Sequence, residues 1–331
     1  MIITKTPFRI SFFGGGSDYP DYYLKYGGKV IGTTIDKYSY LNIRKLPPFF
    51  DYKYRIVYSK IENHNDIDNI LHPSVRETLK YMGINNGVSI NYDGDLPARS
   101  GIGSSSSFTV GLLNGLNALN GKISSKEYLT KTAIEIEQNK IKEFVGSQDQ
   151  TFAAYGGLNK IEFLQNGEIV VEPVLLHKEK LHNLENNLML FFSGISRNSS
   201  DIAHTQIQKI EINKNKIDKM KNLVDDAYKI LTQDIDLDEF GELLDYTWQL
   251  KKSLSDNISN DVIEDIYNRA KKAGAIGGKL LGAGGGGFVL FYVPKQYQEK
   301  VKNALKEFTY VPFKFDFDGS KIVFYRRENE I

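Results

Sequence analysis

Three glycine clusters are the feature of this sequence that most restricts its fold. Ten of the 29 glycines fall at residues 14–16, 101–103 and 282–287, and each cluster borders an apolar or serine-rich run. Glycine lets a backbone turn at positive φ and approach another backbone or a ligand closely. The clusters therefore indicate three places where the chain bends tightly around a ligand or another loop.

The first cluster follows an apolar run, Phe8 to Phe13, that has the character of a strand. Three glycines and a Ser-Asp pair follow this run. They can bring backbone N–H groups and one carboxylate close to a bound ligand. A flexible turn is the alternative. The candidate residues are Gly14, Gly15, Gly16, Ser17 and Asp18.

The second cluster leads into a helix predicted from apolar residues spaced three and four apart, beginning with Phe108 and Leu112. Small residues at a helix start leave free N–H groups at the positive end of the helix dipole, which suits a phosphate. No Gly-Lys-Ser/Thr follows, so it is not a Walker loop. An ordinary capped helix, the alternative, needs only one serine. The candidate residues are Arg99, Ser100, Gly101, Ile102, Gly103, Ser104, Ser105 and Ser106.

The third cluster matches the spacing of a dinucleotide-binding loop through Gly282, Gly284 and Gly287. Such a loop follows a strand and opens a helix, whereas this one precedes the apolar run Phe288 to Val293. We therefore reject that interpretation. The glycines instead predict close backbone packing against another loop or a ligand.

Composition excludes several other functions. The 42 basic and 41 acidic residues leave a net charge of +1, which argues against an extensive nucleic-acid surface. The absence of cysteine excludes disulfides, thiolate metal sites and a catalytic thiol. The start of the chain lacks a basic region followed by an apolar run, and no stretch approaches the length of a membrane span. We expect a cytoplasmic protein with no membrane partner.

Strand-like segments dominate the first hundred residues and helical patterns follow, which favours an α+β architecture. Val30 to Ile35 and Tyr38 to Arg44 are predicted as two strands. A helix is predicted from a capping box of Ser124 and Glu127 to about Val145. The polar stretch 156–185 is the predicted domain boundary.

In this order the three clusters resemble the three signature motifs of the GHMP kinase superfamily. The second is similar to its Pro-x3-Gly-Leu-Gly-Ser-Ser-Ala box, with Ile102 in place of Leu and Ser106 in place of Ala. The resemblance implies the GHMP kinase fold, with a domain like ribosomal protein S5 domain 2 over 1–180. A ferredoxin-like domain would follow over 181–331, with the active site between the two.

The resemblance also implies individual roles. Glu137 lies 12 positions before Asp149, a spacing similar to that of the magnesium-binding Glu and catalytic Asp of galactokinases. Arg9 matches the arginine that accompanies this Asp. The implied cofactors are ATP, cradled by residues 101–106, and Mg²⁺, held by Glu137 and the hydroxyl of Ser104 or Ser105. A solvated Glu137 and an N-cap role for Asp149 are the alternatives.

The first motif bears on the substrate. Galactokinases carry Gly-Glu-His where this chain has Gly14, Gly15 and Gly16, and a missing carboxylate would favour a substrate with a phosphate at that end. The motif is similar to that of D-glycero-D-manno-heptose 7-phosphate kinases, which implies phosphorylation of the anomeric hydroxyl to a 1,7-bisphosphate for surface-glycan precursors. Further substrate candidates are Arg197, for the distal phosphate, Gly284 and Gly285.

Two other functions stay open. One is a kinase of an unphosphorylated sugar such as fucose, and the other is a catalytically silent sensor of sugar and ATP. The predicted partners are small molecules, a sugar phosphate and ATP. The oligomeric state stays open, with a homodimer as one option.

Overall fold

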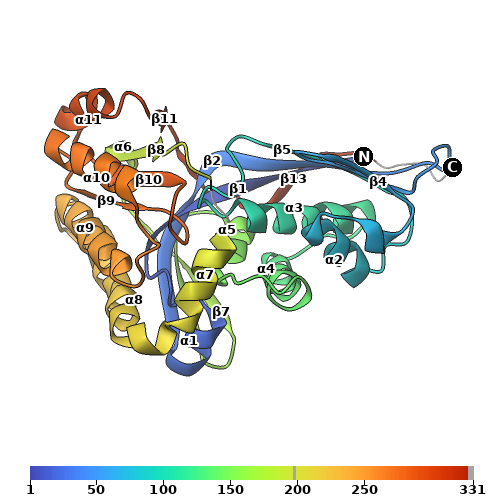
Figure 1. The fold of residues 1–331 in the computed structure, drawn as a ribbon, viewed down its shortest axis with the longest axis horizontal. Coiled ribbons are helices and arrows are strands. Elements are labelled where there is room, and N and C mark those ends of the chain that lie inside the picture. The colour runs from blue at the N-terminus through green and yellow to red at the C-terminus, as the bar shows by residue number, and fades with distance from the viewer. Residues whose placement is uncertain (197–198, 327–331) are drawn as a thin grey trace.

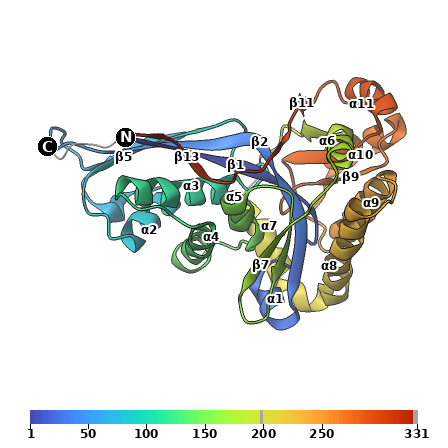
Figure 2. The ribbon, with the colours of Figure 1, turned by 180° about the vertical axis from the view of Figure 1, so that it is seen from behind.

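The computed structural model describes residues 1–196 and 199–326. The chain forms two parts that lie side by side, a long sheet with helices on one face and a second, helix-rich part at one end of it (Figures 1 and 2). No helix in the described ranges has the length and apolar character needed to cross a membrane.

The first sheet joins nine strands of the described chain, in the order β13-β1-β2-β5-β3-β4 along its main path. β12 and β6 also pair with β2, and β7 pairs with β6. Most pairs are antiparallel, but β3 runs parallel to β5. The strands are β1 (Ile2–Phe13), β2 (Gly28–Lys45), β3 (Tyr54–Val57), β4 (Ile61–His64), β5 (Val88–Gly94), β6 (Asn159–Phe163), β7 (Ile169–Pro173), β12 (Phe315–Asp316) and β13 (Lys321–Tyr325).

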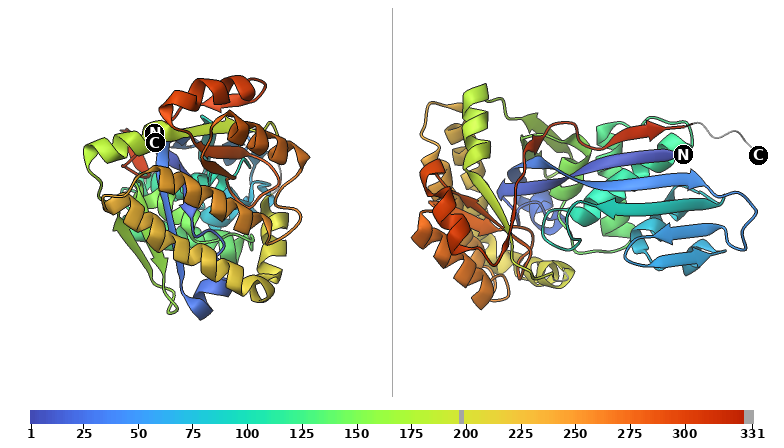
Figure 3. Two further views of the ribbon diagram at one scale, coloured as in Figure 1. Left: turned by 90° about the vertical axis from the view of Figure 1, so that its left-hand side faces the viewer. Right: turned by 90° about the horizontal axis from the view of Figure 1, so that it is seen from above.

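Helices cover one face of this sheet, and the other face, toward the viewer in the right-hand view of Figure 3, is open except at the end that packs against the second part. The central one, α3, packs its apolar residues Leu112 and Leu116 against Leu41 and Ile43 of β2 in one buried cluster. The helices of this part are α1 (Pro20–Tyr26), η1 (Ile67–Asn69), α2 (Pro73–Tyr81), α3 (Ser104–Leu119), α4 (Lys126–Ile134), the π-helix η2 (Glu135–Lys140) and α5 (Gln148–Tyr155).

The second part is built on a four-stranded antiparallel sheet in the order β11-β8-β10-β9. Helices separate β8 from β9 and β10 from β11, which is the β-α-β-β-α-β arrangement of a ferredoxin-like fold. Its elements are α6 (Lys178–Asn187), β8 (Leu188–Phe192), α7 (Ser199–Gln208), α8 (Ile210–Thr232), α9 (Asp238–Lys252), α10 (Asp261–Ala273), β9 (Gly277–Leu280), β10 (Phe288–Tyr292), η3 (Lys295–Tyr297), α11 (Gln298–Ala304) and β11 (Thr309–Val311).

The two parts share a continuous core. Phe12 and Phe13, at the end of β1, both pack edge-to-face on Phe240 of α9, at 5.3 and 5.1 Å between ring centroids. Alternation along β8 sends Leu190 into this shared cluster and Phe191 into a second cluster with α10 and α11. The predicted α+β class is therefore confirmed, and the shared core fixes the end of β1 between the two parts.

The structure corrects two predicted elements. The helix expected from Ser124 to Val145 is capped by Ser125, whose hydroxyl accepts from Tyr128 N, and helical structure ends at Lys140. Ser124 instead accepts a hydrogen bond from Asn117. The two strands predicted over 30–35 and 38–44 are one strand, β2, with an irregular register against β1 at Pro7 and Phe8.

The predicted domains, 1–180 and 181–331, do not account for the position of the last two strands. β12 and β13 follow the second part in the chain, yet they pair with β2 and β1 of the first sheet. The chain therefore crosses between the two parts twice.

Candidate active site

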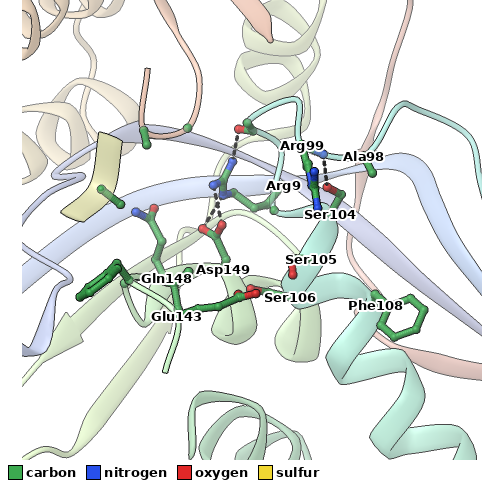
Figure 4. Close-up of a pocket in the computed structure, with 18 of the residues that line it drawn as sticks. Arg9, Ala98, Arg99, Ser104, Ser105, Ser106, Phe108, Glu143, Gln148 and Asp149 are labelled. Carbon is green, nitrogen blue, oxygen red and sulfur yellow. Dashed lines mark hydrogen bonds and ion pairs between the residues drawn. The ribbon is translucent and has the colours of Figure 1, made fainter. Parts of the chain in front are cut away.

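A cavity of about 750 Å³ lies between the end of β1, the N-termini of α3 and α5 and the loops of the second part (Figure 4). Residues from all three glycine-rich segments contribute to its wall. The predicted site residues that line it are Arg9, Gly15, Gly16, Asp18, Arg99, Gly101, Gly103, Ser104, Ser105, Ser106 and Asp149. The other predicted residues lie behind the wall or elsewhere, and Arg197 falls outside the described residues.

An Arg–Asp pair forms the centre of the cavity. The Arg9 guanidinium donates from Nε to Asp149 Oδ1 at 2.8 Å and from Nη2 to Oδ2 at 2.7 Å, and its Nη1 donates to the Gly101 carbonyl at 2.6 Å. Arg9 is almost fully buried, whereas the Asp149 side chain is 26% exposed. A two-point pair fixes the orientation of the carboxylate while leaving it open to a ligand. The pair could therefore hold a reacting hydroxyl in place.

The start of α3 leaves its first backbone N–H groups without a side-chain cap in the described chain. Gly103, in the left-handed region at φ 74°, turns the chain into the helix, and Ser104, Ser105 and Ser106 follow on the cavity side. The Ser104 hydroxyl accepts from Arg99 N at 3.2 Å. Uncapped N–H groups at the positive end of a 16-residue helix form an anion-binding surface.

The second and third glycine clusters pack backbone against backbone. A Cβ on Gly282 would lie 2.5 Å from Gly101 Cα, and a Cβ on Gly287 would lie 2.2 Å from the Ser100 carbonyl oxygen. That oxygen accepts a hydrogen bond from Phe288 N at 3.1 Å. Close packing between loops, predicted from the third cluster, is confirmed. The contact attaches the second part of the chain directly to the loop before α3.

Four residues predicted to contact ligands instead pack against, or hydrogen-bond to, other parts of the protein. Ser100 donates to the Pro97 carbonyl at 2.6 Å, and Ile102 is buried in the core that the two parts share. Gly285 N donates to the Ile258 carbonyl, and a Cβ on Gly284 would lie 2.9 Å from Ile258 Cα. Gly284 and Gly285 therefore pack against the loop before α10 and do not line the cavity.

The first cluster is divided between structural and cavity-facing residues. Ser17 is buried and donates to the carbonyls of Gly14 and Lys29, and a Cβ on Gly14 would lie 2.0 Å from the Lys29 oxygen. Gly15 and Gly16 line the cavity. A Cβ on Gly15 would make only ordinary contacts, 3.7 Å from the Gln148 amide nitrogen and 4.0 Å from the Ser11 hydroxyl. Of the three glycines, Gly15 and Gly16 are therefore the two that can face a ligand.

Asp18 is held rigidly at the cavity wall. Its Oδ1 accepts from Gly16 N at 3.0 Å and its Oδ2 from Gln148 Nε2 at 2.9 Å. Burial raises the pKa of Asp18, and the charge of Asp149 raises it further. The two carboxylates thus stand close enough to interact, with Arg9 already paired to one of them. A sugar hydroxyl beside them could donate to either carboxylate.

Glu137 lies behind the cavity wall and is fully buried. Its Oε2 accepts from Ser106 Oγ at 2.8 Å and from Gln150, whereas Oε1 has no hydrogen-bond partner among the described residues. Burial raises the pKa of Glu137 to about 7. An unpartnered carboxylate oxygen behind the serine loop fits one protein ligand of a hard cation such as Mg²⁺, which takes most of its ligands from water and phosphate.

Glu137→Gln is expected to flatten the pH dependence of stability in the nucleotide-free protein. Because its pKa rises from 4.5 to about 7 on folding, Glu137 contributes stability fully below pH 4.5 and loses it as pH rises through 7. The loss is about 3 kcal/mol in the free energy of unfolding. Urea unfolding at a series of pH values measures it. Equal slopes in wild type and variant would show that Glu137 is not the titrating group.

Sequence reasoning missed two buried lysines that line the cavity, Lys251 of α9 and Lys279 of β9. A signal was present at Lys279, which interrupts an otherwise small and apolar strand, Gly277 to Leu280. Lys251 carried no such signal, because a lysine near a helix C-terminus is ordinary. Neither was assigned a role.

The far end of the cavity is aromatic. His72 stacks on Phe108 with ring centroids 4.5 Å apart, and Tyr58 and Tyr92 pack edge-on against these two rings at 4.9 and 5.4 Å. Burial lowers the pKa of His72 to about 4, so the imidazole is neutral at pH 7. A neutral aromatic wall next to an anion-binding helix start suits a planar base attached to phosphates.

Comparison with known proteins matches both parts of this chain to one family. Residues 69–157 match the family model of the GHMP kinases N terminal domain, and residues 223–311 match that of the GHMP kinases C terminal. The chain is 32% identical to the D-glycero-alpha-D-manno-heptose 7-phosphate kinase of Campylobacter jejuni, over 97% of this chain and 98% of that protein. It is 24% identical to the L-fucokinase/L-fucose-1-P guanylyltransferase of Bacteroides fragilis, over 90% of this chain but only 35% of that longer protein.

Solved structures have the same architecture. A D-glycero-D-manno-heptose 1-phosphate kinase from Bacteroides thetaiotaomicron superposes with a TM-score of 0.80 at 25% identity, covering 98% of this chain and all of the other. The mevalonate kinase of Methanococcus jannaschii gives 0.72 at 22% identity, with 95% and 98% covered. The second match shows the shared fold.

Proposed function

The chain belongs to the GHMP kinase family, and from that membership we propose that it transfers the γ-phosphate of ATP to the anomeric hydroxyl of D-glycero-D-manno-heptose 7-phosphate. The observation that carries the proposal is the wall formed by Gly15, Gly16 and Asp18. This wall keeps one carboxylate, that of Asp18, for sugar hydroxyls. It has no side chain at the position where a second carboxylate would repel a phosphate. The likeness to the Campylobacter heptose 7-phosphate kinase supports the same substrate class.

The Asp149–Arg9 pair would act on the accepting hydroxyl. Asp149 accepts the proton of the anomeric hydroxyl while the hydroxyl oxygen forms a bond to the γ-phosphorus, and the bond from that phosphorus to ADP breaks. Arg9 fixes the orientation of the carboxylate and adds positive charge beside the transferring group. The N–H groups at the start of α3 would hold the polyphosphate.

Magnesium would be held by Glu137 and the exposed hydroxyl of Ser105, with water and nucleotide oxygens completing its shell. When bound, it neutralises charge on the phosphates. Ser106 donates to Glu137 from the cavity wall and so keeps the carboxylate oriented toward the serine loop. The aromatic wall of Tyr58, His72, Tyr92 and Phe108 would take the adenine.

A Gly15→Glu variant is expected to fold and to raise the KM for the sugar phosphate about 100-fold. Gly15 has space for a side chain, so the backbone tolerates the change. A carboxylate about 5 Å from the phosphate would cost roughly 3 kcal/mol per charge pair at an effective dielectric of 20. Steady-state kinetics measure it, with Gly15→Gln as the neutral control of equal size. Equal KM values for the two variants would mean that no substrate phosphate lies near Gly15.

A substrate panel tests the function itself. With Mg²⁺ and ATP, coupled ADP release is measured on D-glycero-D-manno-heptose 7-phosphate, the unphosphorylated heptose, the 1-phosphate, L-fucose and galactose. We expect kcat/KM for the 7-phosphate to exceed that for the free heptose at least about 100-fold, the worth of two charge-assisted hydrogen bonds. Faster turnover of fucose would favour a kinase of unphosphorylated sugars. No turnover of any sugar would favour a sensor.

Arg197 lies outside the described residues, so its role as a contact of the distal phosphate stays a prediction. Its Ala variant should raise the KM for the phosphorylated sugar and spare activity on the free sugar. A loss of equal size on both substrates would remove it from the site.

A further inference from the structure

Two buried lysines in the cavity have no carboxylate partner among the residues that the structure describes. Lys279 is 4% exposed and Lys251 is 8% exposed, and both line the cavity. Charged side chains so deeply buried are normally paired with an opposite charge. Here the neighbouring charges of Lys279 include two more cations, Lys251 and Arg9, and one acid, Asp18, which is itself held by Gly16 and Gln148.

The hydrogen bonds of both ammonium groups leave donors unused. Lys279 Nζ donates to the Ser11 and Phe12 carbonyls at 3.0 and 2.6 Å, and Lys251 Nζ donates to the Leu280 and Gly282 carbonyls at 2.9 and 2.5 Å. An ammonium has three N–H donors. Each lysine therefore retains one donor that no described residue takes up. Two such donors on one cavity wall are arranged for an anion that the protein itself does not supply.

The backbone contacts place Lys279 at the sugar end of the cavity. The carbonyls that it contacts end β1, directly before the Gly14–Gly16 segment. The start of α3 and the aromatic wall, which suit a nucleotide, are formed by other segments of the first part. Lys251 lies next to Lys279, because Lys251 Nζ donates to the carbonyl of Leu280, the residue after Lys279.

We propose that Lys279 and Lys251 form the receptor for the substrate's own phosphate, the group that is not transferred. The proposal rests on the proposed function and adds to it the residues that select a phosphorylated sugar over a free one. Compact ammonium groups suit a phosphate as point charges. In the free protein, burial lowers the pKa of Lys251 to about 7 and that of Lys279 well below its usual range. A phosphate dianion would favour the charged form of both lysines.

Lys279→Met and Lys251→Met are the test, with Lys252→Met as the matched control. Lys252 is the next residue of α9, but it pairs with Glu264 at 3.1 Å and does not line the cavity. We expect each cavity variant to raise the KM for heptose 7-phosphate about 10- to 100-fold, the worth of one charge-assisted hydrogen bond. The KM for ATP and the kcat/KM for the free heptose should change by less than about threefold, and the control should match wild type.

Three other results would separate failure of this proposal from failure of the proposed function. If ATP rather than the sugar phosphate shows the raised KM, the lysines bind the nucleotide and the proposal is wrong. If wild type prefers the 7-phosphate and both variants keep that preference, the proposal fails while the proposed function stands. If wild type does not distinguish the two sugars, the proposed function itself fails.

A second measurement on the intact wild-type protein covers the case in which the variants do not fold. Inorganic phosphate should inhibit competitively against the heptose 7-phosphate and not against the free heptose, because it would occupy the receptor without the sugar. Competition against ATP alone would overturn the proposal.

Discussion

Asp149→Asn is expected to lower kcat about 1,000-fold, because an amide cannot accept the proton of the attacking hydroxyl. Phosphoryl transfer depends on positioning as well as on the proton, so a residual rate should remain. The KM values for ATP and for the sugar should change by less than about threefold, since most binding contacts lie elsewhere in the cavity. Coupled ADP release under saturating substrates measures kcat.

A surface carboxylate provides the control for this variant. Asp225 forms an ion pair with Lys29 at 3.0 Å and is 42% exposed, so Asp225→Asn should leave kcat unchanged. Undiminished turnover in Asp149→Asn would remove Asp149 from the reaction. It would leave the Arg9 pair as a structural feature only.

Arg9→Met is expected to lower kcat by about 1,000-fold as well, for a different reason. The change removes two hydrogen bonds to Asp149 and one to the Gly101 carbonyl. Losing one preorganised donor at a reacting centre costs roughly 100-fold to 1,000-fold in kcat. Here the loss also frees Asp149 to rotate away from the acceptor. Single-turnover rates with saturating ATP and sugar measure the chemical step directly.

Arg9→Lys and Arg55→Met complete this comparison. A lysine keeps the charge but not the two-point geometry, so it should recover only part of the rate. Arg55, on β3, does not line the cavity and should tolerate Met. Full activity in Arg9→Lys would mean that charge alone, without orientation, is what Asp149 requires.

The helix start that forms the candidate anion-binding surface could be predicted because its signals are local. Gly103 followed by serines starts α3 at Ser104, as the pattern indicates, and Asn260, whose residue type favours helix starts, caps α10. Each of these features depends on a few consecutive residues and on short hydrogen bonds. Such signals survive in any tertiary context.

Features that depend on distant segments could not be predicted. The capping pattern at Ser124 competed with the adjacent Ser125, and the helical structure ends at Lys140, before the predicted end at Val145. The loop that follows brings Glu143 to the cavity. The placement of Lys251 and Lys279 likewise results from the pairing of two separate parts of the chain, which no local pattern encodes.

The pairing of the two chain ends has a consequence for synthesis of the protein. β13 adds to the edge of β1 through Ile2↔Tyr325 and Ile3↔Phe324, and Met1 and Arg326 exchange backbone hydrogen bonds of 2.8 and 2.9 Å. The outer edge of β1 thus stays uncovered until β13, which lies far later in the sequence, has been synthesised. Contacts so distant in sequence form slowly, and an open edge can pair with other chains. The first sheet therefore cannot be completed until β13 has been synthesised, and until then the edge of β1 is open to pairing with other chains.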